Sequence, residues 1–203
     1  MIFIGITGGI GSGKSFVCSL FAEKKIPIFH ADESAKEISD RPEVRKEIVA
    51  AFSNSVLTPD NTLDRKKIAS IVFSEHDKLR TLNSIIHPLV FLEFEIWKKS
   101  LPQPDRYAIA EAALMFESGM EEKVDYVLSV ITEEDIRIKR VMERDKVDRD
   151  LVVSRMANQL PTQELIEHSD FVLHNNGTKE EVSAKVSFFH SLFLTLNHRK
   201  EIQ

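Results

Sequence analysis

Five short apolar stretches, separated by longer amphipathic ones, predict a parallel sheet covered by helices. The first stretch, residues 2–7, is continuously apolar, as in a strand that is buried on both faces. Four further stretches have an apolar or alternating character: 27–30, 107–110, 126–130 and 171–174. Because helical patterns lie between them, we expect a doubly wound α/β fold with a parallel sheet of about five strands.

The long interval over residues 35–104 carries a polar, helical pattern. Its leucines and isoleucines recur at turn-like intervals: Leu79, Leu82, Ile86, Leu89, Leu92 and Ile96. Prolines punctuate it throughout: Pro42, Pro59, Pro88, Pro102 and Pro104. Pro88 is expected to break or kink the long helix. The interval therefore predicts an all-helical insertion.

A second excursion, residues 132–169, is rich in charge and interrupted at Pro161. After the last predicted strand, apolar residues recur at spacings of four and three: Val182, Val186, Phe189, Phe193 and Leu196. This spacing predicts an amphipathic helix that docks on the sheet. We expect three parts: a core formed by residues 1–34, 105–131 and 170–203, a helical insertion over 35–104, and a lid over 132–169.

Size and charge exclude several classes of protein. The 203 residues suffice for one α/β core with excursions, and are too few for two full-sized domains. A net charge of −5 argues against a nucleic-acid-binding protein, which usually presents a basic surface. The single cysteine, Cys18, excludes an intrachain disulfide and indicates a reducing compartment; its simplest role is that of a small core residue. Without a leader-like start or a run of about 18 apolar residues, we expect a cytoplasmic protein that does not bind membranes.

Residues Gly8–Ser15 read Gly-Gly-Ile-Gly-Ser-Gly-Lys-Ser and match the phosphate-binding pattern G-x-x-x-x-G-K-[ST]. The pattern lies between an apolar strand and a helix, which is the context it requires. Its glycines let backbone N–H groups point at phosphates, Lys14 adds a positive charge, and the Ser15 hydroxyl can ligate Mg²⁺. A dinucleotide-binding G-x-G-x-x-G would need a glycine in place of Lys14. We therefore expect a nucleoside triphosphatase or a kinase.

Polar residues follow the predicted strands at the edge where a parallel sheet binds its ligands: His30, Asp32, Glu111, Thr132 and Asn175. Carboxylates, an amide and a phosphate loop at one edge suit phosphoryl transfer. Simpler explanations remain open for each residue. Asp32 could cap a helix, and Asn175 opens an Asn-Asn-Gly turn.

Three arginines of the second excursion, Arg137, Arg140 and Arg144, fall within about 60° of one another on a helix. Such a stripe could close over phosphates and stabilise the charge that develops in transfer. It could equally be a solvated face paired with the neighbouring glutamates.

With these residues placed, the chain resembles the dephospho-CoA kinase family over residues 2–178. The strongest block, Thr7–Ser15, is similar to the family's T-G-G-I-G-S-G-K-S. Further blocks resemble family patterns: Leu63-Asp64-Arg65, Phe73, Leu82-Asn83, Ile86-His87-Pro88, Leu114, Phe116-Glu117-Ser118-Gly119, Arg140, Arg144, Arg155, Gln159-Leu160-Pro161, Asp170, and Asn175 with Gly177. The chain departs from the family at three places. His30 replaces the first aspartate of D-A-D, Glu111 replaces an aspartate followed two residues on by Pro-Leu-Leu, and Phe16 replaces a more common threonine.

The resemblance implies ATP-dependent phosphorylation of the ribose 3′-hydroxyl of dephospho-CoA, with Mg²⁺ as cofactor. It implies catalytic roles for Asp32, which would orient or deprotonate the hydroxyl, and for Lys14 and Arg140 on the phosphates. The implied ATP-binding residues are Gly9, Gly11, Ser12, Gly13, Lys14, Ser15, Phe16, Arg144 and Asn175. The implied substrate-binding residues are Asp32, Arg65, His87 and Glu117, and the implied metal-binding residues are Ser15 and Glu111. His87 could instead simply end a helix before Pro88.

Two alternatives stay open beside this hypothesis. A nucleoside or nucleotide kinase would share the phosphate loop, although the long helical insertion favours a bulkier acceptor. A regulatory nucleotide-binding switch would be expected to carry D-x-x-G and N-K-x-D motifs, and the sequence contains neither.

Overall fold

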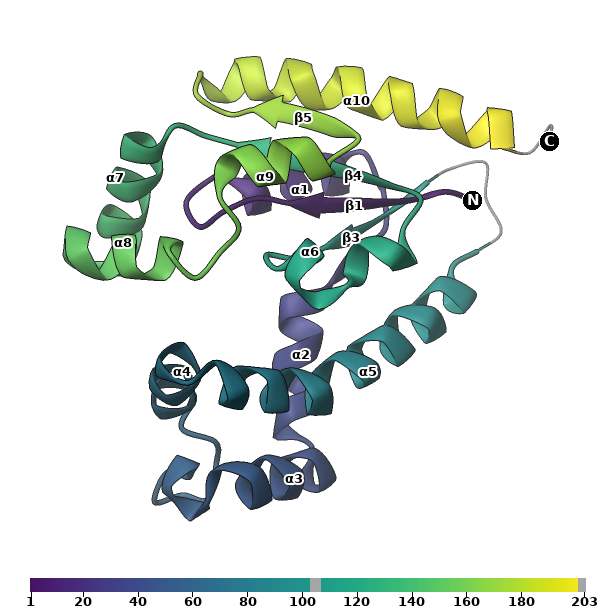
Figure 1. Cartoon of the computed structure of the whole chain (residues 1–203). Coiled ribbons are helices and arrows are strands. Elements are labelled where there is room, and N and C mark those ends of the chain that lie inside the picture. Colours follow the sequence, from purple (N-terminus) through teal and green to yellow (C-terminus); the bar gives the residue numbers. More distant parts are fainter. Residues whose placement is uncertain (103–106, 201–203) are drawn as a thin grey trace. The chain divides into compact units, whose positions relative to one another are not determined.

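The computed structural model of the protein describes residues 1–102 and 107–200, and the chain divides into two compact units. One unit comprises Met1–His30 with Leu101–Gln203, and the other comprises Ala31–Ser100 (Figure 1). Pro104, expected to help close the insertion, lies outside the described residues, as does the expected boundary at 104/105. The subdivision into core, insertion and lid stays a prediction.

A five-stranded parallel sheet forms the centre of the first unit, with the strand order β2-β3-β1-β4-β5. Its strands are β1 (Phe3–Thr7), β2 (Ile28–His30), β3 (Ala108–Glu111), β4 (Tyr126–Ile131) and β5 (Phe171–His174). Each of the five predicted strands is therefore confirmed, and the fold class with them. The order places β1, which leads into the phosphate loop, between β3 and β4, so the loop emerges in the middle of the sheet edge.

Helices cover both faces of this sheet: α1 (Lys14–Glu23) and α10 (Lys179–Lys200) on one face, α6 (Met115–Ser118) and α9 (Thr162–His168) on the other. A 3₁₀ turn, η2 (Met120–Lys123), follows α6. The helices α7 (Glu134–Asp145) and α8 (Arg149–Met156) pack on each other in a separate apolar cluster. Successive strand residues face opposite sides. Ile4 and Ile6 thus join the core under α1 and α10, whereas Gly5 faces Met115 of α6. The predicted docking of the C-terminal helix is confirmed.

Aromatic rings fill much of the core between α1, α10 and the sheet. The ring centroid of Phe193 lies 5.3 Å from that of Tyr107 and 6.2 Å from that of Phe21. Cys18 is buried in the same core, which raises the pKa of its thiol to about 12. The cysteine therefore behaves as the small core residue that the sequence suggested.

The second unit is built from α2 (Ala31–Asp40), α3 (Pro42–Phe52), α4 (Arg65–Ser74) and α5 (His76–Ser100), with a 3₁₀ turn, η1, at Asn54–Val56. An isolated antiparallel bridge joins Leu57 to Leu63. Of the break or kink predicted at Pro88, the break is wrong, because α5 continues through Pro88 to Ser100. Pro88 is exposed, and the buried Val90 and Phe94 beyond it anchor the helix. Leu92 and Ile96, two members of the apolar series, are more than half exposed.

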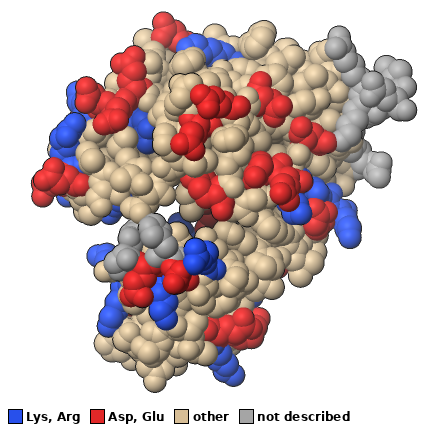
Figure 2. Space-filling model, in the orientation of Figure 1, with Lys and Arg blue, Asp and Glu red and all other residues tan. Residues whose placement is uncertain are grey.

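Acidic and basic side chains are interspersed over the face drawn in Figure 2. Within the described part of the chain, none of the helices combines the length and the apolar character needed to span a bilayer.

Candidate active site

The phosphate loop runs from the end of β1 to the start of α1 and turns on glycines. Gly11 and Gly13 have φ values of 79° and 86°, a region that residues with a Cβ rarely adopt. A Cβ at Gly13 would also collide with the side-chain amide of Asn175. The loop ends at the N-terminus of α1, where backbone N–H groups and the helix dipole favour a bound phosphate.

Lys14 is buried, and its ammonium group pairs with Oε1 of Glu111 at the end of β3. The second oxygen of Glu111 lies 2.5 Å from Nδ1 of His30, at the end of β2. Burial alone would raise the pKa of the Glu111 carboxyl, but Lys14 and His30 outweigh it and hold that pKa below its usual range. The parallel register of β2, β3 and β1 brings these groups together, since His30 and Ile6 both pair with Glu111.

On the other side of the loop, Thr132 and Asn175 hold its backbone. The Thr132 hydroxyl lies 2.9 Å from the carbonyl oxygen of Ser12 and 3.1 Å from that of Asn175. The side-chain amide of Asn175 donates to the same Ser12 carbonyl over 2.7 Å. Both side chains are buried. The strand ends β1, β3, β4 and β5 therefore converge on one loop, as the sequence predicted.

The three arginines of α7 reach three different partners. Nη2 of Arg140 donates to the carbonyl of Asn175 over 3.2 Å, and its Nη1 is buried without a hydrogen-bond partner in the described part of the chain. Arg144 forms an ion pair with Asp145 over 2.7 Å, which also accepts from Arg155. Arg137 turns to the back of the phosphate loop, where its Nε donates to Ile10. Nη1 of Arg140 also lies close to the phosphate loop, because a Cβ built at Gly13 would come within 3.5 Å of it.

Comparisons with known proteins agree on one family. The family model described as dephospho-CoA kinase matches residues 2–181. The chain belongs to the dephospho-CoA kinase family. The dephospho-CoA kinase of Fusobacterium nucleatum is 39% identical over 189 residues, 93% of this chain and 97% of that protein. That of Salinibacter ruber is 41% identical over 187 residues, 91% and 94% of the two chains. The crystal structure of TT1252 from Thermus thermophilus covers 93% of this chain and 95% of its own, with 31% identity and a TM-score of 0.82.

Membership of this family confirms the resemblance found in the sequence and the prediction of a kinase. Asp32, the carboxylate predicted to orient or deprotonate the acceptor hydroxyl, is the second residue of α2 and follows β2 with only Ala31 between them. It therefore lies inside the first helical turn, not at the N-cap position that the sequence left open. A carboxylate in this turn is favoured by the helix dipole.

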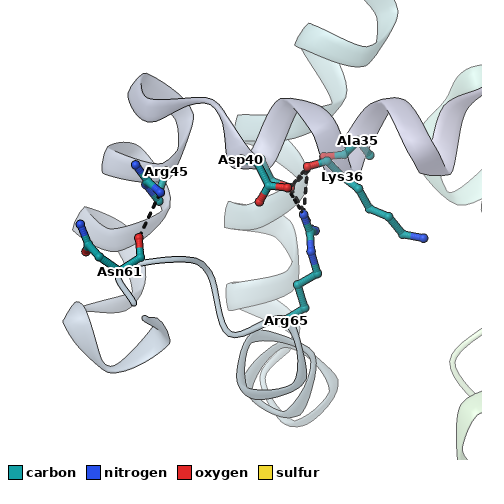
Figure 3. Close-up of polar contacts among 7 residues, drawn as sticks. Ala35, Lys36, Asp40, Arg45, Asn61 and Arg65 are labelled. Atoms are coloured by element: carbon teal, nitrogen blue, oxygen red, sulfur yellow. Dashed lines mark hydrogen bonds and ion pairs between the residues drawn. The ribbon is translucent and has the colours of Figure 1, made fainter. Parts of the chain in front are cut away.

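Arg65, a predicted substrate-binding residue, reaches the C-terminal turn of α2 within its own unit. Figure 3 shows its guanidinium group directed at Lys36 and Asp40. Nη2 donates to the Lys36 carbonyl over 3.0 Å and to the Asp40 carboxylate over 2.8 Å, while Nη1 lies 3.3 Å from the Ser39 hydroxyl. Arg65 thus joins the start of α4 to the C-terminal turn of α2, the helix whose second residue is Asp32.

Two other predicted substrate-binding residues have structural contacts of their own. The carboxylate of Glu117 in α6 accepts a hydrogen bond of 3.0 Å from the backbone N–H of Leu160. His87 is half-buried beside Phe91, with ring centroids 6.2 Å apart, and burial lowers the pKa of its imidazole. His87 lies within α5, so it does not end a helix as the alternative proposed.

The site offers few side chains that could bind Mg²⁺. Among the described residues, no group of three or more His, Cys, Asp or Glu side chains could hold a metal ion. Magnesium in phosphoryl transfer usually takes one or two protein oxygens and completes its shell with phosphates and water. Ser15, exposed at the start of α1, and the Glu111 carboxylate fit this requirement.

Proposed function

We propose that this chain transfers the γ-phosphoryl group of ATP to the ribose 3′-hydroxyl of dephospho-CoA, giving coenzyme A and ADP. The observation that carries the donor half is the buried Lys14 at the end of a glycine loop, held by Glu111. The acceptor half rests on membership of the family. In the reaction, the 3′-oxygen bonds to the γ-phosphorus, the bond to the bridging oxygen of ADP breaks, and the hydroxyl proton leaves to a carboxylate.

The donor phosphates would lie against the backbone of the loop and the first turn of α1. We assign the loop residues Gly9, Gly11, Ser12, Gly13, Ser15 and Phe16 to this contact. The Lys14 ammonium group, which pairs with Glu111, would also bind the β- and γ-phosphate oxygens. Arg140, whose Nη1 has no partner among the described residues, would donate to the charge that develops in transfer. Arg144 and Asn175 are further proposed ATP contacts.

Mg²⁺ fits the same site. The Ser15 hydroxyl would bind it directly, and Glu111 would contact it through water. When bound, the ion neutralises the charge of the β- and γ-phosphates.

On the acceptor side, Asp32 would accept the hydroxyl proton or orient the hydroxyl for in-line attack. Arg65 would bind the diphosphate of dephospho-CoA, because guanidinium suits phosphate geometry and this side chain is 45% exposed. His87 and Glu117 are the other proposed substrate contacts. We place the enzyme in the cytoplasm, where a single buried thiol is stable.

The test is a coupled assay of ADP release with four acceptors: dephospho-CoA, AMP, a nucleoside and water. We expect turnover with dephospho-CoA, and we expect mass spectrometry and phosphorus NMR to locate the new phosphate on the 3′-oxygen. Turnover only with AMP or a nucleoside would favour the kinase alternative. ATP binding without turnover of any acceptor would favour the regulatory switch.

A further inference from the structure

The backbone of one phosphate-loop residue, Ile10, is hydrogen-bonded at both its N–H and its carbonyl group by residues distant in sequence. Its N–H donates to Oε1 of Gln159 over 2.7 Å. Its carbonyl accepts from Nε of Arg137 over 2.9 Å. Arg137 lies in α7, and Gln159 lies in the segment between α8 and α9. The backbone of Ile10 is thus fixed by two segments that follow the loop by more than a hundred residues.

The side chain of Ile10 is held as well. It packs against a small apolar cluster, formed by Ile138 and Val141 of α7 and Val152 of α8. The side chain of Ile10 therefore joins the apolar core of the α7–α8 hairpin. Its backbone N–H and carbonyl groups form hydrogen bonds with polar residues of the same region. Three contacts of different chemistry act on a single residue, so its orientation is strongly determined.

The Arg137 side chain is buried against the loop and is not directed into solvent. Only 7% of it is exposed, and this burial lowers the pKa of its guanidinium, although Glu134 opposes the shift. Its Nη1 also donates to the Thr162 hydroxyl at the start of α9, over 3.3 Å. A buried charge is retained only where its hydrogen bonds compensate for lost hydration.

The glycines of the loop allow this close approach. A Cβ at Gly9 would collide with the guanidinium group of Arg137. A Cβ at Gly11 would come within 2.6 Å of the Arg137 carbonyl oxygen. Gly9 and Gly11 are therefore needed for the close contact of the loop with Arg137 of α7, in addition to any contact with phosphate.

We propose that Arg137 and Gln159 are positioning residues of the ATP site, which fix the Ile10 peptide and keep the loop in its phosphate-binding conformation. Arg137 is held by the loop and by α9, because its Nε donates to Ile10 and its Nη1 donates to Thr162. It anchors the base of α7 to the loop, and Arg140, three residues further along, is held at a set distance from the phosphates. The inference deepens the proposed function and rests on it for the identity of the nucleotide.

The test measures ATP binding by titration calorimetry on the full chain, in the absence of an acceptor. Arg137→Met and Gln159→Leu each remove one bond to Ile10 at nearly constant size. We expect each to weaken ATP binding by about tenfold, since a loop that must be ordered on binding binds more weakly. The loss of ATP affinity in the double variant should be smaller than the product of the two single losses, because both residues hold the backbone of Ile10.

Two further variants separate positioning from charge and from folding. Gln159→Glu keeps the acceptor oxygen and should bind ATP more tightly than Gln159→Leu. Lys139→Gln removes an exposed positive charge from the same helix and should leave ATP affinity unchanged. In steady-state kinetics of Arg137→Met and Gln159→Leu, the KM for ATP should rise while the KM for dephospho-CoA stays within about twofold of wild type.

Unchanged ATP affinity in Arg137→Met and Gln159→Leu would overturn the proposal, and so would an equal rise in both KM values. If Arg137→Met does not fold, the comparison of Gln159→Leu with Gln159→Glu decides alone. Because calorimetry needs no acceptor, a failure of this inference is distinct from a failure of dephospho-CoA as the substrate.

Discussion

The ammonium group of Lys14 lies against the carboxylate of Glu111, and each side chain is only 10% exposed. The lysine belongs to the phosphate loop after β1, and the carboxylate ends the neighbouring strand β3. A buried ammonium without a counter-charge would be costly. Glu111 therefore stabilises the lysine before ATP arrives, and the phosphates of ATP must take over that partner role.

Glu111→Gln should destabilise the protein and make its stability depend more on nucleotide. Losing the carboxylate leaves the Lys14 charge buried and uncompensated, which costs about 3 kcal/mol of unfolding free energy. ATP should restore more stability in the variant than in wild type, because its phosphates supply the missing negative charge. Urea unfolding with and without ATP measures both effects. Glu122→Gln, at an exposed glutamate, is the control, and equal stabilisation of all three proteins by ATP would refute the coupling.

Asp32→Asn should lower kcat by about 10²- to 10⁴-fold, the usual contribution of a general base. The amide keeps the size of the side chain but cannot accept the hydroxyl proton. The KM for ATP should change little, since the residue is proposed to act on the acceptor. Glu33→Gln, the next carboxylate of the same helical turn, is the matched control. Full turnover by Asp32→Asn would remove this residue from the mechanism.

Arg140→Ala should slow phosphoryl transfer, by an amount on the order of 10³-fold, more than it weakens ATP binding. The reason is that a donor aimed at developing charge contributes mainly in the transition state. Single-turnover rates and ATP affinities, measured in parallel, separate the two effects. If only the KM for ATP rises, Arg140 is a binding residue without a part in transfer.

Arg65→Ala should raise the KM for dephospho-CoA, whereas Asp40→Asn should not. Both changes break the ion pair between α4 and the end of α2, which joins two partly exposed side chains and contributes up to about 1 kcal/mol. Only the first removes a guanidinium group that could bind the diphosphate. Steady-state kinetics with dephospho-CoA, together with urea unfolding of both variants, measure the difference. Equal KM values in the two variants would leave Arg65 a purely structural contact of α2.

His87 should make the protein less stable as the pH falls below about 6.5, the usual pKa of histidine. Burial lowers the pKa of His87 in the folded state, so the unfolded chain takes up a proton at a higher pH than the folded one. The contribution of His87 to the free energy of unfolding is thus fully present above its unfolded pKa and is lost as the pH falls toward its lower folded pKa. In His87→Asn this loss should shrink, which urea unfolding at about pH 7.5 and about pH 5.5 can measure. Parallel stability profiles for the two proteins would argue against it.

Local patterns revealed the strands and the chemistry of their ends. Each strand has an apolar stretch of its own, and parallel strands share a carboxyl edge. The gathering of Glu111, Thr132 and Asn175 around the phosphate loop could therefore be predicted from their positions at the ends of the strands. The arginine stripe was less informative. Helical spacing places three side chains on one face but does not say which neighbour each reaches.

The sequence by itself determined the α/β class, the phosphate loop and the family, because these depend on residue types at fixed local spacing. Only the tertiary structure decided that α5 continues through Pro88, and that Arg137 and Gln159 hold Ile10 from behind. These outcomes depend on packing between segments far apart in the chain. Burial of Val90 and Phe94 outweighs the hydrogen bond lost at a proline, and the bonds to Ile10 exist only where α7 folds back against the loop.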